Sequence, residues 1–362
     1  MNILGNYMLK LNPFYTPPVQ SPEEIIWAGF KDVRHKMEAH IKQAIRIPNS
    51  SLVLNWGEYG SGKTHAAKFF QKKDVLTDLS DGLSLPYHIL ICFPQGKEPV
   101  KELFIQVIDK LDIEDLRKKF RNKYTHEVFG QCTDNILIQN ILRILFDETV
   151  AATQMKAYLY GNAQIKAEFI REGVQRKLES DSDYTEFLAS LFSFLTYGKS
   201  VFSCVIFWID EFENMALLNL ANVSKMNKCV RTLIDKAPNN LLIFLNLTQS
   251  AMMDVDDLSA YLQEEILSRI KDRILLPTPG TMEVKEYLKD LLNNPTCRVG
   301  KPQNFTPFTE DVIDCIIKDL KGSVQLRKYN EVFSSILEHA MSDKINVIDS
   351  GYYQSVKSEV IG

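Results

Sequence analysis

Residues 51–64 read SLVLNWGEYGSGKT, a short apolar run followed at once by a glycine-rich stretch. From Gly57 to Thr64 the sequence matches G-x-x-x-x-G-K-[ST] in full. The surrounding patterns predict a strand before the motif and a helix from about Gly62, which is the context that a phosphate-binding loop requires. A chance glycine turn is the alternative, and the complete motif in this context disfavours it.

Each part of this motif suits the binding of phosphate. Glycines at 57, 60 and 62 allow successive backbone N–H groups to turn inward as an anion nest, backed by the positive end of the following helix. Lys63 is predicted to reach the β and γ phosphates of ATP, and the Thr64 hydroxyl to bind Mg²⁺. The residues predicted to bind nucleotide are Gly57, Glu58, Tyr59, Gly60, Ser61, Gly62, Lys63, Thr64 and His65.

A second apolar run ends in two adjacent carboxylates. Residues 205–209 read VIFWI and are followed by Asp210 and Glu211. Asp210 is predicted to join the Mg²⁺ shell, and Glu211 to orient and activate the water that attacks the γ-phosphate. Two acids at a strand end could also form an ordinary solvated turn, but the phosphate motif upstream favours the catalytic interpretation.

Composition narrows the class of protein. The 362 residues are 45% hydrophobic and 24% charged, with 42 Lys plus Arg against 46 Asp plus Glu. The resulting net charge of -4 does not favour a general binder of polyanions. The six cysteines form no C-x-x-C pair, and no stretch is apolar enough to span a membrane. We therefore expect a folded cytoplasmic protein without disulfides, a zinc site or a membrane partner.

Strand-like and helix-like runs alternate along the middle of the chain. Besides 51–56, the runs 87–93, 201–209 and 241–248 have the length and composition of buried parallel strands. Strands that alternate with helices predict an α/β fold, the three-layer parallel sheet of a P-loop NTPase. Residues 101–199 are almost wholly helix-patterned and too long for a simple crossover, so we expect a helical insertion there.

The two ends of the chain have other patterns. Residues 1–50 are expected to hold an extended arm, a short helix capped from Ser21, and a longer helix from Phe30 that stops at Pro48. Beyond Pro277 the pattern is entirely helical. The predicted organisation is an N-terminal arm with helices (1–50), an α/β nucleotide-binding core (51–280) and an α-helical lid (281–362).

Taken together, these residues resemble the AAA+ ATPases, in particular the branch that includes origin-recognition initiators, transposon target-selection ATPases and related bacterial regulators. The likeness covers most of the chain. It implies hydrolysis of ATP with Mg²⁺ at the interface between subunits of a ring or filament. Residues 12–14 and 26–30 resemble the arm and the adenine-side box of this branch, although Gly29-Phe30 replaces the usual Gly-Arg.

The resemblance implies roles for two further segments of the core. Residues 241–249 resemble a sensor 1 segment, in which Asn246 or Thr248 would bond the γ-phosphate or the attacking water. A Ser-Arg pair before the last core strand makes Arg269 the candidate arginine finger, with Arg273 as the alternative. Such an arginine would reach the nucleotide of a neighbouring subunit and stabilise charge that develops during phosphoryl transfer.

Residues 322–330 resemble the sensor 2 helix of the lid. The commoner spacing between glycine and arginine would place Gln325 at the sensor position. A variant of this spacing that occurs in bacterial relatives places Arg327 there instead. We assign Arg327, which implies that the lid contacts the bound nucleotide.

The sequence says less about the biological role of such an ATPase, and two hypotheses stay open. The first is an oligomeric ATPase that couples nucleotide state to DNA or to an effector, such as a nuclease or transposase, in mobile-element biology or antiviral defence. The second is a nucleotide-switched protein-interaction scaffold with slow or no turnover and no DNA contact. The basic and aromatic residues 117–124 could contact DNA, but such a stretch is more often a helix with a solvated basic face.

Overall fold

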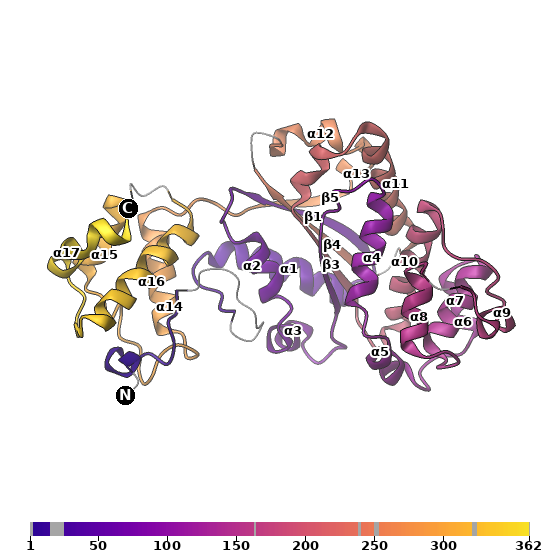
Figure 1. The fold of residues 1–362 in the computed structure, drawn as a ribbon, viewed down its shortest axis with the longest axis horizontal. Helices are drawn as coiled ribbons and strands as arrows, with labels where there is room; N and C mark the ends of the chain where they lie inside the picture. Colours follow the sequence, from indigo (N-terminus) through magenta and orange to yellow (C-terminus); the bar gives the residue numbers. More distant parts are fainter. Residues whose placement is uncertain are drawn as a thin grey trace. The chain divides into compact units, whose positions relative to one another are not determined.

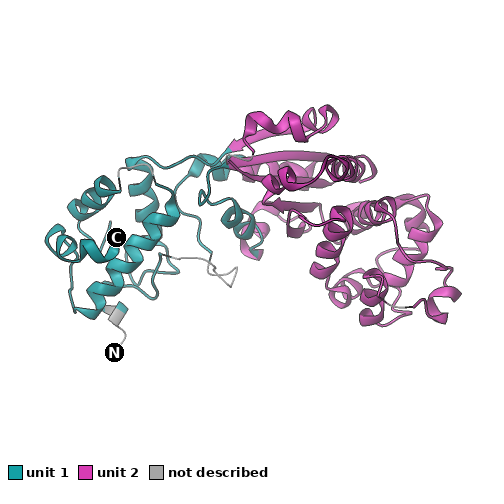
Figure 2. Ribbon diagram, turned by 45° about the horizontal axis from the view of Figure 1, so that its top comes forward, with its two compact units in different colours: residues 1–36, 57–72, 275–362 teal, residues 37–56, 73–274 magenta. Residues whose placement is uncertain are grey.

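The computed structural model describes residues 3–14, 25–162, 164–237, 240–249, 253–320 and 324–361. The chain divides into two compact units (Figure 2). Unit 1 comprises Met1–Lys36, Gly57–Lys72 and Leu275–Gly362, and unit 2 comprises Met37–Trp56 and Lys73–Ile274. The central sheet therefore belongs to unit 2, while the glycine-rich stretch and the C-terminal helices belong to unit 1.

Five strands form the sheet, in the order β2-β3-β4-β1-β5. Figure 1 labels β1, β3, β4 and β5 among the surrounding helices. They are β1 Ser50–Gly57, β2 Tyr87–Cys92, β3 Val205–Asp210, β4 Leu241–Thr248 and β5 Ile270–Leu275. β2 pairs with β3 and β3 with β4, both in parallel. The predicted run 201–209 is four residues too long at its start. Phe202 in this stretch is apolar because its ring packs on Tyr87, at the start of β2, and on Phe120 of the helical segment.

Helices surround the sheet, and residues 101–199 fold into helices as their pattern predicts. Their treatment as an insertion stays a prediction. The helices that lie wholly or mostly in unit 2 are α1 Lys31–Arg46, α3 Lys73–Ser80, α4 Pro99–Lys110, α5 Ile113–Phe120, α6 Glu127–Cys132, α7 Ile136–Phe146, α8 Ala152–Leu159, α9 Ala167–Arg171, α10 Asp181–Leu195, α11 Leu220–Lys236, α12 Leu258–Tyr261 and α13 Glu264–Leu267. Short 3-10 turns cover Tyr197–Lys199, Phe212–Leu217 and Val255–Asp257.

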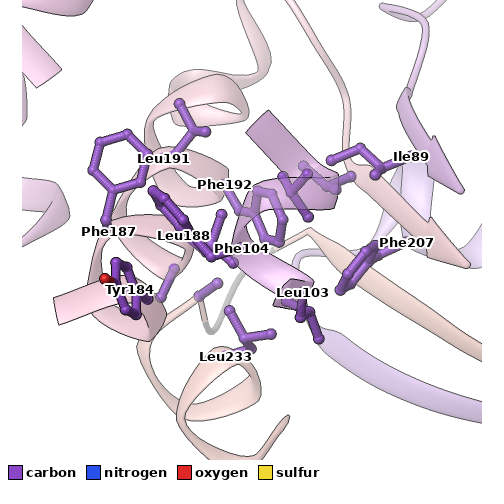
Figure 3. Packing of buried hydrophobic residues seen from close by; sticks show 14 of the residues in the cluster. Ile89, Leu103, Phe104, Tyr184, Phe187, Leu188, Leu191, Phe192, Phe207 and Leu233 are labelled. Carbon is purple, nitrogen blue, oxygen red and sulfur yellow. The ribbon is translucent and has the colours of Figure 1, made fainter. Parts of the chain in front are cut away.

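One hydrophobic cluster joins α4, α10 and α11 to one face of the sheet (Figure 3). Ile89 of β2 and Phe207 of β3 share this cluster with Phe104 of α4, Phe192 of α10 and Leu233 of α11. Side chains alternate between the two faces of a strand, so the residues on either side of Phe207 point to the opposite face. The near-continuous apolar character of β3 and β4 follows from burial on both faces.

Aromatic rings line that opposite face. The ring of Trp208 stacks on the ring of Phe244, with centroids 4.0 Å apart. The imidazole of His88 stacks on Trp208 from the other side, at 6.1 Å. A row of three rings therefore crosses β2, β3 and β4.

Unit 1 combines the N-terminal arm with the C-terminal helices. Its elements are a 3-10 turn at Ile3–Tyr7 and the helices α2 Lys63–Phe69, α14 Thr281–Asn293, α15 Glu310–Asp319, α16 Leu326–Ser342 and α17 Ser350–Val360. The prediction of an extended arm is wrong at this 3-10 turn. Tyr7 in this turn is buried, as are Leu9 and Phe14 after it, because the C-terminal helices offer an apolar surface. The ring of Phe14 packs on Phe308 and Phe333. The predicted helix after Ser21 begins outside the described residues.

Across the part of the chain that the structure describes, no helix combines the length and the apolar character that a membrane crossing needs.

Candidate functional site

The glycine-rich turn, residues 57–62, starts at the last residue of β1 and leads directly into α2. At Gly57 a Cβ would lie 2.4 Å from the carbonyl oxygen of Leu276, so a side chain cannot be accommodated without a backbone shift. Gly60 has φ +83°, and a Cβ there would lie 3.3 Å from the Cβ of Gln325. Both the close approach and the left-handed backbone require glycine. The turn is therefore a tightly curved backbone, as the motif predicts.

Lys63 lies against this turn. Its Nζ donates to the carbonyl oxygens of Gly57, at 2.8 Å, and Glu58, at 2.9 Å, and contacts the Ser61 hydroxyl at 3.2 Å. Only 6% of the residue is exposed. A buried ammonium at such a turn suits an anionic phosphate.

The segment before α1 contacts the helix that follows the turn. The Nε2 of His65 lies 2.8 Å from the carbonyl oxygen of Ile26. The ring of Trp27 packs on Phe69 at 5.3 Å and on Phe70 at 5.7 Å. The segment that resembles an adenine-side box therefore fixes α2 from outside, and the side chain of His65 is engaged by the protein backbone.

Two residues at the start of α16 contact the glycine-rich turn within unit 1. The Nε2 of Gln325 donates to the Glu58 carboxylate and, at 2.8 Å, to the Thr278 hydroxyl. The guanidinium of Arg327 lies over the ring of Tyr59, 4.7 Å from its centroid, and donates to its hydroxyl. Both alternatives for the sensor 2 position thus reach the turn, on neighbouring residues. The preceding residues 322 and 323 lie outside the described residues.

Asp210, at the end of β3, belongs to a buried polar row that crosses three strands. The Nδ2 of Asn246 on β4 donates to Asp210 Oδ1 at 3.2 Å. The Nδ2 of Asn55 on β1 donates in turn to Asn246 Oδ1 at 3.0 Å. Both asparagines are fully buried, and Asp210 is 6% exposed. No motif singles out Asn55, and its only signal in the sequence is a lone amide within the apolar run that leads to the glycine-rich turn.

The residues after the two central strands have separate partners. Glu211 adopts φ +57°, which is uncommon for a residue other than glycine, and its exposed carboxylate accepts a hydrogen bond from Asn214 at 3.2 Å. The backbone N–H of Thr248 donates to the Glu213 carboxylate at 2.8 Å. Of the two alternatives for sensor 1, the structure therefore brings Asn246 to Asp210 and Thr248 to Glu213.

Arg269, the candidate arginine finger, follows α13 and forms an ion pair with Asp235 of α11. Asp235 also pairs with Arg231, which reaches Glu265 at 3.2 Å. The side chain of Arg269 is 34% exposed, whereas the alternative, Arg273, lies exposed on β5. A finger acts on another subunit, so its assignment to Arg269 stays a prediction.

Three side chains of the basic segment 117–124 are engaged by the protein itself, whereas Lys118, Lys119, Arg121 and Lys123 are exposed. Arg117 is 6% exposed and donates to the carbonyl oxygens of Leu145, at 2.7 Å, and Ile144, at 3.1 Å. These carbonyls belong to the last turn of α7, where an arginine can satisfy otherwise unpaired acceptors. Phe120 is buried, and the Tyr124 hydroxyl donates to Asp147. These three side chains are therefore not a surface for phosphates and bases.

The two residues predicted to hold Mg²⁺, one in each unit, have suitable ligand chemistry. Thr64 offers a hydroxyl and Asp210 a carboxylate, and both are the hard oxygen ligands that Mg²⁺ prefers. Among the described residues, no group of three His, Cys, Asp or Glu side chains could hold a metal by itself. Mg²⁺ commonly uses one or two protein oxygens together with phosphate oxygens and water.

By sequence, no protein-family model and no curated protein matches the chain. By structure, the chain is similar to the ORC1 protein of Aeropyrum pernix in complex with DNA, with a TM-score of 0.51 and 13% identity over 98% of this chain and 70% of that one. The ORC2 protein of Aeropyrum pernix in its ADPNP–ADP complexes has a TM-score of 0.55, with 13% identity over 97% and 72%.

Cdc6p from Pyrobaculum aerophilum has a TM-score of 0.53, with 11% identity over 98% of this chain and 72% of that one. At such low identity the likeness establishes the fold. The chain has an AAA+ fold of the ORC/Cdc6 kind, with a C-terminal helical region. The fold class predicted from the sequence is therefore confirmed.

Proposed function

We propose that this protein binds ATP with Mg²⁺ and hydrolyses it as an oligomeric AAA+ ATPase. The observation that carries the proposal is the geometry of the glycine-rich turn with Lys63. Glycine is required at two positions of the turn, and the ammonium of Lys63 is buried against the carbonyl oxygens of Gly57 and Glu58. This arrangement places an ammonium group beside the backbone turn against which a phosphate would lie.

The other residues supply the remaining roles in phosphoryl transfer. Thr64 and Asp210 would hold Mg²⁺, which neutralises charge on the β and γ phosphates when it is bound. Glu211 would orient the attacking water and accept its proton. Arg327 would reach the nucleotide from the lid, and Arg269 would act on the nucleotide of a neighbouring subunit. The neighbour of similar fold in its ADPNP–ADP complexes supports a test with nucleotides.

Two substitutions separate binding from hydrolysis. We expect Lys63→Ala to lose nucleotide affinity, measured by titration of a fluorescent ATP analogue. Glu211→Gln should retain that affinity and lose about 100-fold or more in the rate of phosphate release, since a general base typically contributes that much. Lys68→Ala, on the same helix as Lys63, is the matched control for loss of a charge. Hydrolysis by the Glu211 variant at the rate of the unchanged protein would refute the assignment.

The task that we propose for the ATPase is to couple nucleotide state to DNA or to an effector protein. The resemblance of the sequence to transposon target-selection ATPases supports a role in mobile-element or defence biology, with a nuclease or transposase as the effector. The solved complex of the similarly folded ORC1 protein with DNA supports a test with duplex DNA.

We expect added duplex DNA to raise the hydrolysis rate and to promote oligomers in analytical ultracentrifugation. No response to any nucleic acid would refute the DNA part of the proposal. ATP binding without turnover would favour the nucleotide-switched scaffold instead.

A further inference from the structure

We infer that Asn55 is a positioning residue for the Asp210 carboxylate and acts through Asn246. The inference rests on the proposed Mg²⁺–nucleotide site and deepens it. Asn55 lies two residues before the glycine-rich turn, and Asp210 ends β3. β4 lies between β1 and β3 in the sheet, so the row of three side chains joins the strand that leads into the turn to the strand that ends in the carboxylate.

The charge at one end of this row determines the orientation of both amides. An ionised carboxylate only accepts hydrogen bonds, so Asn246 must turn its NH₂ group toward Asp210. Its carbonyl oxygen then points toward β1, where the NH₂ group of Asn55 donates to it at 3.0 Å. Without Asn55, the carbonyl oxygen of Asn246 loses the hydrogen bond that it accepts from β1. A residue that does not touch Asp210 therefore helps to hold the amide that bonds Asp210 Oδ1.

The far end of the row carries a polar atom whose burial costs stability. The Oδ1 of Asn55 is buried and has no hydrogen-bond partner among the residues that the structure describes. A buried amide oxygen without a partner is destabilising. Buried polar groups that violate the packing rules occur mainly where function requires them.

The test compares nucleotide affinity with and without Mg²⁺. The dissociation constant of a fluorescent ADP analogue is measured in Mg²⁺ and in EDTA, and the ratio of the two constants reports on the metal site. We expect Asn55→Leu to reduce this ratio roughly 10- to 100-fold, the usual effect of removing a group that orients a metal ligand. Affinity in EDTA should stay at the level of the unchanged protein.

A double variant separates positioning from a structural role. Asn55→Leu combined with Asn246→Leu leaves neither amide of the pair in the core, so the midpoint of thermal unfolding should recover to that of the unchanged protein or above it. The Mg²⁺ ratio should remain low. Recovery of the midpoint and the ratio together would overturn the inference, since a structural role predicts both. This outcome can be measured even if the single variant fails to fold.

Asn227 provides the matched control. It is also buried in unit 2, where its amide bonds the carbonyl oxygens of Val223 and Tyr261 and the backbone N–H of Gln263. Asn227→Leu should lower the unfolding midpoint and leave the Mg²⁺ ratio unchanged. An Asn55 variant with an unchanged ratio would overturn the inference while the proposed function stands. Absence of Mg²⁺-dependent nucleotide binding in the unchanged protein would instead overturn the proposed function.

Discussion

A change from pH 8 to pH 5 should destabilise unit 2 through His88. Both ring nitrogens of His88 are buried and find no hydrogen-bond partner in the described part of the chain, and the ring stacks on Trp208. Burial lowers the pKa of His88 from 6.5 to about 3. The folded state therefore binds fewer protons than the unfolded state between these two values, so its stability falls as the pH drops below about 6.5.

The size of this effect follows from the two pKa values. A pH of 5 is about 1.5 units below the ordinary histidine pKa of 6.5, so the His88 imidazole is almost fully protonated in the unfolded chain. In the folded chain it stays neutral at this pH. Each unit corresponds to about 1.4 kcal/mol, so His88 alone should lower the free energy of unfolding by about 2 kcal/mol. A loss of this size is a large fraction of the stability of an ordinary domain.

Urea unfolding at the two pH values measures the loss. In a variant whose sole tryptophan is Trp208, fluorescence reports on this face of the sheet. His88→Phe keeps an aromatic ring and removes the titration, so its loss of stability between pH 8 and pH 5 should be smaller by about 2 kcal/mol. An NMR titration of the His88 ring provides an independent measurement. An imidazole that titrates near pH 6.5 in the folded protein, or a Phe variant with the full loss, would refute this reasoning.

Three further substitutions test particular contacts. Arg117→Met should lower the free energy of unfolding by about 2 kcal/mol, because two carbonyl oxygens of α7 lose their charged hydrogen-bond donor. Tyr59→Ala should raise nucleotide affinity roughly two- to fivefold, since removal of an exposed cation–π contact frees Arg327 for the nucleotide. Arg269→Ala should retain nucleotide binding and lose about 1,000-fold or more in hydrolysis rate, and mixing with a Lys63 variant should partly restore turnover.

Each of these predictions has a contradicting result. If the Arg117 variant has the same free energy of unfolding in urea as the unchanged protein, the Arg117 side chain is solvated, as it would be on a basic surface. If Tyr59→Ala raises nucleotide affinity equally with and without Arg327, Tyr59 does not compete with the nucleotide for the Arg327 side chain. Full hydrolysis by the Arg269 variant would exclude the finger role, and Arg273→Ala would then be the next variant to measure.

Features that depend on neighbours in the chain could be predicted from the sequence. The glycine-rich turn, Lys63 and the strand before them form one continuous segment, so their geometry follows from glycine conformations and hydrophobic pattern. The β3 and β4 strands and the helices of residues 101–199 have equally clear periodicity. These local signals were sufficient to predict an α/β P-loop fold.

Features that depend on distant partners were predicted less well. The N-terminal arm was expected to be extended, yet Tyr7 and Phe14 are buried against helices more than 250 residues away in the chain. The basic segment reads as exposed, yet Arg117 is buried because its partners are carbonyls of α7. Composition indicates that a side chain is charged, but the packing of other elements decides whether it reaches solvent.

The sequence by itself determined the phosphate motif, the two adjacent acids and the class of fold. Only the tertiary structure decided which polar residues meet. Asn55 and Asn246 are 191 positions apart, and the contact between them exists because β1 and β4 are neighbours in the sheet. Strand order is set by the packing of the whole domain, and no local pattern encodes it. For the same reason, both Gln325 and Arg327 matched a sensor 2 pattern in sequence, and the fold brought each to a different residue of the turn.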